Sequence, residues 1–319
     1  MKKNLIALAV AATMVPAIAA AEGASIGGYT DILWIHDNNN NAFTAAAEID
    51  FRNTVGDVTV GVDVDILLGG TAGTALGTDE INLEQAFFAW NAVENVTVIA
   101  GLFNNPIGLD ADDSIDQPTT QAGLIYGTLD AATALHVGNN ISGLAVAYNA
   151  GVATITVGIL NEITGGGNVS EFLGNPSSSG SDNSIALVVN ASPIEGLDLE
   201  FGYVTMDDNT NLGDSAMNIN VSFNTGPATI TAEILDVDAW DDMLYGFGGY
   251  YDVMEGTQIG LRYESNSNNE NTGGTEEQIN LVAWHDLADN LTVGAGYNIN
   301  TNGNGDDDEQ AVIEFLAKF

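Results

Sequence analysis

Residues 57–68 have the sequence DVTVGVDVDILL, in which polar and apolar side chains alternate. One face of this run carries Val58, Val60, Val62, Val64 and Ile66, and the other carries Thr59, Gly61, Asp63 and Asp65. A period of two residues predicts a β-strand with two unlike faces. In a soluble sandwich the apolar face points to a core, whereas in a membrane barrel it points to lipid and the polar face lines the lumen. Alternation alone leaves both architectures open.

The same alternation recurs along the chain. It is clear at residues 48–52, 198–203, 218–223 and 291–298. In the first of these, Ile49 and Phe51 oppose Glu48, Asp50 and Arg52. No stretch after residue 22 shows a sustained period of about 3.6 residues, so we expect an all-β protein.

The connections between these runs alternate between tight and long. Tight turns are predicted at residues 55–57, 93–95, 150–151, 193–196, 225–226, 254–256 and 287–290. Longer links, rich in Asn, Gly and Asp, fall at 37–41, 69–78, 105–140, 161–182, 207–214, 236–242, 265–275 and 301–308. Seven tight turns and eight long links predict sixteen strands. An even strand number with short turns at one end and longer loops at the other is typical of an antiparallel outer-membrane barrel, here over residues 22–319.

The first 21 residues have the pattern of a secretory signal peptide. Lys2 and Lys3 precede an apolar stretch at 5–12, which is followed by Pro16 and an alanine-rich run at 17–21. We expect cleavage after Ala19 or Ala21. The apolar stretch is shorter than the roughly 20 residues of a transmembrane helix, so insertion into the outer membrane must use strands.

The chain is strongly acidic. It has 44 acidic and five basic residues, a formal net charge of −39, and loss of Lys2 and Lys3 would leave −41. This charge excludes nucleic acid as a natural partner and favours cations. The chain has no cysteine, which excludes disulfides and thiolate catalysis. Its three histidines follow no ligand spacing, so we expect no enzyme.

The final residues, 311–319, alternate once more and end on Phe319. This ending resembles the signal that the outer-membrane assembly machinery reads. Together with residues 1–11, the strand count, the long link after the fifth strand and residues 100–109 (AGLFNNPIGL), it makes the chain similar to Gram-negative outer-membrane porins.

The resemblance implies several properties. It implies a homotrimer in outer-membrane lipid and lipopolysaccharide, with one pore per subunit for passive diffusion of small hydrophilic solutes. It also implies that the loop at 105–140 folds inward as a constriction. Such porins usually line one side of the eyelet with several arginines, whereas here only Arg52 and Arg262 are available, so a strong transverse field is not expected.

Two groups of carboxylates are the candidate pore lining. The loop after the fifth strand carries Asp110, Asp112, Asp113 and Asp116. These side chains could form a negative lining, bind Ca²⁺ through their oxygens, or stay solvated, and they lack the glycine and terminal glutamate of an EF-hand. The strands supply lumen-facing charges, which we assign to Glu48, Asp50, Arg52, Asp63, Asp65, Glu84, Arg262 and Glu264, with further acidic residues at Asp198, Glu200 and Glu233.

Fixed negative charge in a confined channel raises the local cation concentration. The sequence therefore predicts a cation-preferring porin without a tightly bound cofactor other than a candidate Ca²⁺. The alternative is a non-conducting acidic surface barrel that binds divalent cations or a partner.

Overall fold

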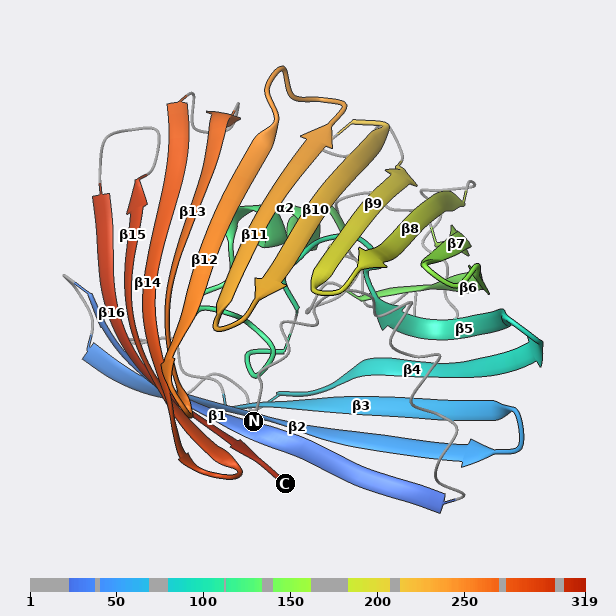
Figure 1. Ribbon diagram of the computed structural model, residues 1–319, viewed down its shortest axis with the longest axis horizontal. Helices are drawn as coiled ribbons and strands as arrows, with labels where there is room; N and C mark the ends of the chain where they lie inside the picture. Colours follow the sequence, from blue (N-terminus) through green and yellow to red (C-terminus); the bar gives the residue numbers. More distant parts are fainter. Residues whose placement is uncertain are drawn as a thin grey trace.

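The computed structural model describes residues 23–37, 41–68, 80–111, 113–133, 140–161, 183–206, 213–269, 274–301 and 307–319. The expected signal peptide and Asp112 lie outside these residues. Within them, sixteen antiparallel strands follow one another around a closed barrel, which β1 and β16 seal (Figure 1). No helix of the described residues is both long enough and apolar enough to cross a membrane. The predicted fold class and strand number are confirmed.

The strands of the first half are β1 (Gly23–Asp37), β2 (Asn41–Val55), β3 (Val58–Leu68), β4 (Glu80–Val93), β5 (Val96–Asn104), β6 (Asn140–Asn149), β7 (Ala153–Leu160) and β8 (Ser184–Ile194). Those of the second half are β9 (Leu197–Thr205), β10 (Ser215–Thr225), β11 (Ala228–Val237), β12 (Leu244–Met254), β13 (Thr257–Asn269), β14 (Gly274–Ala288), β15 (Leu291–Thr301) and β16 (Asp307–Lys318). A helix, α2 (Leu124–Thr133), lies between β5 and β6.

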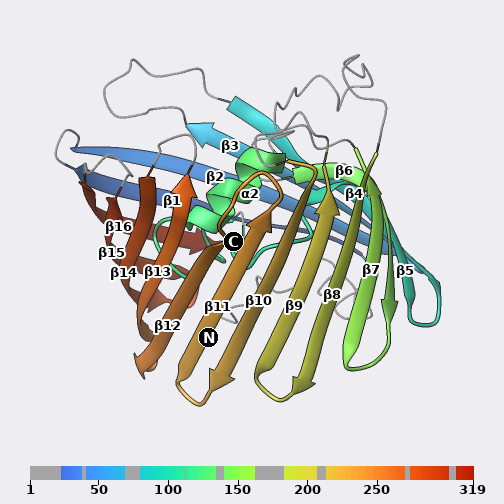
Figure 2. The ribbon, with the colours of Figure 1, turned by 90° about the horizontal axis from the view of Figure 1, so that it is seen from above.

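All seven predicted tight turns join consecutive strands, and Figure 2 shows the turns of β8–β9 and β10–β11 side by side at one end of the barrel. The predicted link at 265–275 is shorter than expected, because β13 continues to Asn269 and β14 starts at Gly274. Pairing between the two strands satisfies the backbone of this Asn- and Ser-rich segment, and its polar side chains suit a strand end in water.

The alternating faces have the orientation of a membrane barrel. Val60 is 42 % exposed and Ile49 is 40 % exposed, whereas Asp63 is fully buried and Glu48 is 2 % exposed. A sandwich would bury the apolar face and expose the carboxylates. The apolar faces therefore form the lipid-facing surface and the polar faces point into the barrel.

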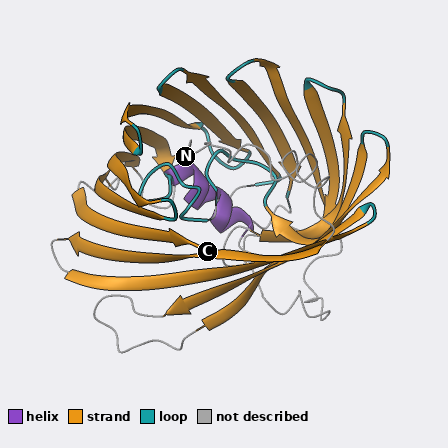
Figure 3. Ribbon diagram, turned by 60° about the horizontal axis from the view of Figure 1, so that its bottom comes forward, coloured by secondary structure: helices purple, strands orange, loops and turns teal. Residues whose placement is uncertain are grey.

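Residues 105–111 and 113–133, between β5 and β6, lie inside the barrel, where α2 is seen in Figure 3. Ile107, Ile125 and Leu129 of this segment belong to one buried apolar cluster with residues of the strands around it. The strand residues include Ile99, Ile141 and Val188. This part of the interior is apolar, unlike the polar lumen expected over most of the chain, because the inner loop covers it.

Candidate functional site

The inner loop, which the structure describes at residues 105–111 and 113–133, is held on one side by carboxylates of the barrel. Glu200 of β9 accepts a hydrogen bond from Gly108 N at 3.2 Å, and Glu233 of β11 accepts one from Leu109 N at 2.9 Å. Glu264 of β13 accepts one from Ile125 N, in the first turn of α2, at 3.2 Å. These carboxylates thus satisfy backbone donors of the loop.

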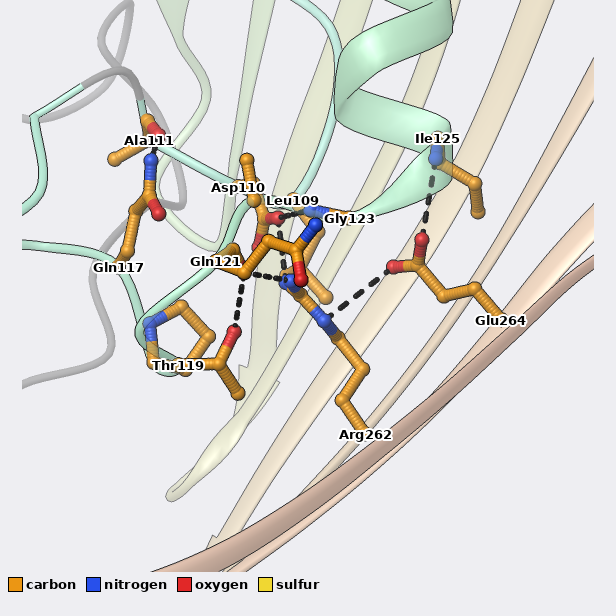
Figure 4. A network of polar contacts seen from close by, with 12 residues as sticks. Leu109, Asp110, Ala111, Gln117, Thr119, Gln121, Gly123, Ile125, Arg262 and Glu264 are labelled. Atoms are coloured by element: carbon orange, nitrogen blue, oxygen red, sulfur yellow. Dashed lines mark hydrogen bonds and ion pairs between the residues drawn. The ribbon is translucent and has the colours of Figure 1, made fainter. Parts of the chain in front are cut away.

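Arg262 of β13 completes this side of the barrel (Figure 4). Its Nη1 binds Asp110 Oδ2 at 2.5 Å, its Nη2 donates to Gln121 O at 2.5 Å, and its Nε lies 3.7 Å from Glu264 Oε1. Asp110 also accepts from Gly123 N at 2.9 Å. The side chains of Arg262 and Asp110 are each 5 % exposed, so this is a buried, charge-paired clamp. We call Glu200, Glu233, Arg262 and Glu264 the anchor wall.

Glycines on the strands make room for the loop. A Cβ added at Gly202 of β9 would overlap the side chain of Ile107, and one at Gly296 of β15 would overlap Thr120. Two further side chains donate to loop carbonyls: Trp284 Nε1 to Pro118 O at 3.0 Å and Gln278 Nε2 to Ala122 O at 3.2 Å. The loop is therefore fixed by shape as well as by hydrogen bonds.

Strands β2 to β4 form a different inner surface, which we call the acidic wall. It consists of Glu48, Asp50, Arg52, Asp63, Asp65 and Glu84. Arg52 makes a two-pronged ion pair with Asp63, with Nη2 at 2.7 Å from Oδ2, and lies over the ring of Phe87 at 5.3 Å. Asp50 and Asp65 are half-buried and face the interior.

Asp113 of the inner loop faces the acidic wall. Tyr29 Oη of β1 donates to Asp113 Oδ1 at 3.4 Å, and the Asp113 carboxyl lies against Glu48. Burial, and then the nearby carboxylates of Asp116 and Asp50, raise the pKa of Asp113. Asp113 is thus the group that brings the loop and the acidic wall together.

The four loop aspartates predicted as one lining are separated by the structure. Asp110 belongs to the clamp with Arg262, Asp113 faces the acidic wall, and Asp116 is exposed on a turn. Asp112 lies outside the described residues. The roles of these side chains in conduction stay predictions.

Two features of the site were missed in the sequence. Glu200 and Glu233 were assigned to the lumen but not to loop anchoring, although each also accepts from an asparagine of β10: Asn220 at 3.0 Å and Asn218 at 2.8 Å. Two asparagines two residues apart on a lumen face are the available signal for such a network. The second feature is a register shift between β3 and β4 that leaves Glu84 as an extra residue of β4.

Phe319, the predicted assembly signal, ends the chain at the seam between β16 and β1. Its backbone N donates to Gly28 O at 3.1 Å, and its side chain is 65 % exposed. This placement leaves the side chain accessible, and its part in assembly stays a prediction.

Comparison with known proteins identifies the family. A model of the Gram-negative porin family matches residues 7–305, and the chain therefore belongs to that family. The barrel is similar to the anion-selective porin from Comamonas acidovorans (12 % identity, 93 % of this chain and 99 % of that chain, TM-score 0.69). It is also similar to OprB of Pseudomonas putida (12 % identity, 93 % and 94 % covered, TM-score 0.69). A loop-deletion mutant of OmpT, an outer membrane protein of Vibrio cholerae, matches at 16 % identity, with 93 % and 99 % covered and a TM-score of 0.60.

No curated protein matches the sequence. The family and the barrel nevertheless define the class of protein: an outer-membrane channel for small solutes.

Proposed function

We propose that this porin is a cation-preferring diffusion channel for small hydrophilic solutes. The acidic wall supports the proposal most directly. Five carboxylates of this wall face the interior together with Arg52, whose charge is taken up by Asp63. The other arginine of the chain, Arg262, is paired with Asp110 and Glu264. Neither arginine therefore offers an unpaired positive charge to an anion.

The charges of the interior, rather than the barrel itself, determine ion selectivity in this proposal. The anion-selective porin of Comamonas acidovorans has a similar barrel, so this architecture is compatible with the opposite preference. In a narrow aqueous path with low-dielectric walls, fixed carboxylates attract cations and repel anions. The half-buried Asp50 and Asp65 are the members of the acidic wall best placed to act on a passing ion.

The assembled state belongs to the same proposal. The signal peptide is cleaved after Ala19 or Ala21, and the mature chain lies in outer-membrane lipid and lipopolysaccharide as a homotrimer. Amino-terminal sequencing of the protein from outer membranes tests the cleavage. The mass of the unheated, detergent-extracted complex tests the trimer.

Reversal potentials across a KCl gradient in planar bilayers test the function. We expect steady conductance steps and a preference for K⁺ over Cl⁻ that is larger in dilute salt, because the Debye length is about 10 Å at 0.1 M and about 3 Å at 1 M. A preference for Cl⁻ would contradict the proposal. An absence of steps from correctly folded protein would favour the non-conducting acidic barrel instead.

A further inference from the structure

Three carboxylates of the acidic wall converge on one point inside the barrel. Glu48 of β2, Asp63 of β3 and Glu84 of β4 each place an oxygen within 4.8 Å of the other two. Their side chains belong to residues that are 2 %, 0 % and 1 % exposed. Three ionised carboxylates so close together and so little hydrated repel one another strongly, so the group needs positive charge.

The backbone of β4 is shaped to bring the third carboxylate in. Pairing with β3 passes from Asp63 opposite Gln85 to Val64 opposite Leu83, so Glu84 is the extra residue of a β-bulge. As a result two consecutive residues, Glu84 and Gln85, are both buried on the inner face. A bulge that redirects a side chain is a feature found next to functional sites, and regular alternation would not direct both side chains inward.

One oxygen of the group has no hydrogen-bond partner. Glu48 Oε2 is buried and makes no hydrogen bond to any described residue. A buried carboxylate oxygen without a donor loses its hydration without compensation. This oxygen is therefore available to a positively charged ligand.

We propose that Glu48, Asp63 and Glu84 form a binding site for a divalent cation of the Ca²⁺ type. The three carboxylates and Arg52, which is paired with Asp63, carry a net charge of −2, the charge that a divalent cation neutralises. The oxygens are hard ligands, as Ca²⁺ and Mg²⁺ prefer. Ca²⁺ also accepts irregular sets of carboxylate oxygens, whereas Mg²⁺ demands near-ideal octahedral geometry, so three carboxylates fixed on separate strands suit Ca²⁺ better.

The site would also connect the inner loop to the barrel. Asp113 of the loop lies against Glu48 and is placed to offer a further oxygen. A bound cation would hold the loop at the acidic wall more firmly than the contact of Asp113 with Glu48 and its long contact with Tyr29. Binding of a cation at Glu48, Asp63 and Glu84 does not depend on whether the barrel conducts ions.

Calcium binding to the purified, folded full-length protein in detergent tests the proposal. The protein is stripped with a chelator and titrated with Ca²⁺ by calorimetry. The double variant Glu48→Gln, Glu84→Gln keeps side-chain volume and removes two charges from the site. A matched control, Glu255→Gln with Asp289→Asn, removes two charges from exposed tight turns.

We expect the wild type and the control to bind one Ca²⁺ with similar affinity. The double variant should bind it roughly tenfold or more weakly, since ligand charge tunes Ca²⁺ affinity over decades. Millimolar Ca²⁺ should raise Tm in the wild type and the control but not in the double variant, because a ligand that binds only the folded state stabilises it.

Equal loss of affinity in the control and the double variant would show that Ca²⁺ is held only by the overall negative charge, and would contradict the proposed site. An absence of saturable Ca²⁺ binding to the wild type would also contradict it. Because both measurements are made without current flow, they succeed or fail independently of the reversal-potential experiment. Unheated electrophoretic mobility confirms that each variant has folded as a barrel.

Discussion

The anchor wall and the acidic wall both present carboxylates to the interior, but they differ in the supply of donors. On the anchor wall, Glu200, Glu233 and Glu264 each accept from a backbone N–H of the inner loop. The acidic wall has five carboxylates and one guanidinium, that of Arg52, which is paired with Asp63. Residue type therefore does not determine the role of a carboxylate in this barrel. The donors that reach it do.

The difference has an energetic consequence. A buried carboxylate with charged and backbone donors is a structural element, because removing its partner leaves an uncompensated charge. A carboxylate with few donors keeps its field and attracts a cation or a proton. The anchor wall should thus govern the position of the loop, and the acidic wall should govern ions.

The largest effect should come from Arg262. Replacing Arg262 with Gln would leave Asp110 and Glu264 buried without their guanidinium, at an expected cost of about 3–5 kcal/mol of unfolding free energy. The equivalent change at Arg52 should cost less, about 1–3 kcal/mol, because it leaves the buried Asp63 without its guanidinium but Arg52 itself is 36 % exposed. Urea unfolding of the two variants in the same detergent measures both. Equal costs would remove the distinction between the walls.

A steric change at the anchor wall should have the next largest effect. Valine at Gly202 would collide with Ile107 and should cost about 1–3 kcal/mol while displacing the loop. Valine at Gly249 is the control, because a Cβ there meets no atom within 4 Å, and its effect should stay within about 0.5 kcal/mol. Truncating Ile107 to Ala in the Gly202→Val background should restore much of the loss. Without such rescue, the contact with Ile107 would not be the cause.

A third comparison separates the walls by ion selectivity. The pair Asp50→Asn, Asp65→Asn and the pair Glu200→Gln, Glu233→Gln each remove two negative charges. The first pair should reduce the K⁺ preference in dilute KCl clearly more, because Glu200 and Glu233 are nearly inaccessible and their charge is engaged by the loop. Reversal potentials measure the difference. A larger effect from the anchor pair would reverse our assignment of the walls.

The sequence predicted much of the barrel because strand faces and turns are local properties. Val60 and Asp63 reveal their environments through a period of two, and Gly56 or Gly226 marks a tight turn where φ is positive. Those signals require no knowledge of distant residues. The strand count and the inner and outer faces followed from them.

The partners across the interior could not be predicted in the same way. Asp110 and Arg262 are 152 residues apart, and no local pattern selects this pair from the other carboxylates. The bulge at Glu84 could not be predicted from the sequence either. The extra residue shifts the alternation of β4 by one position, so that Phe87 faces inward and Phe88 faces outward, and no local pattern indicates this shift. The site therefore depends on contacts between the loop and distant strands. In the sequence, the clearest sign of these contacts is a glycine on a strand where the loop packs closely, such as Gly202.

The smallest effect concerns the pH dependence of Asp113, where the loop meets the acidic wall. Burial raises the pKa of this carboxyl above its unfolded value of about 3.9. The folded chain therefore holds the proton more tightly than the unfolded chain. The contribution of Asp113 to stability is fully present below the unfolded pKa and is lost as pH rises through the folded pKa.

The groups that face Asp113 are Tyr29, Glu48, Asp50, Asp65 and Asp116. Burial and the carboxylates of Asp116, Asp50 and Asp65 oppose its ionisation, whereas hydrogen bonds with Glu48 and Tyr29 lower its pKa without cancelling the rise. Replacing Asp113 with Asn should therefore stabilise the chelator-treated protein at neutral pH relative to the wild type, and the advantage should shrink as pH falls. Urea unfolding at a series of pH values measures the difference, with Asp289→Asn as the exposed control. Added Ca²⁺ should reduce the advantage, because a cation at Glu48, Asp63 and Glu84 would attract the Asp113 carboxylate and replace the proton. An advantage for Asn that grows toward low pH would mean that Asp113 is stabilised as a carboxylate, and its hydrogen bonds with Glu48 and Tyr29 would then outweigh burial.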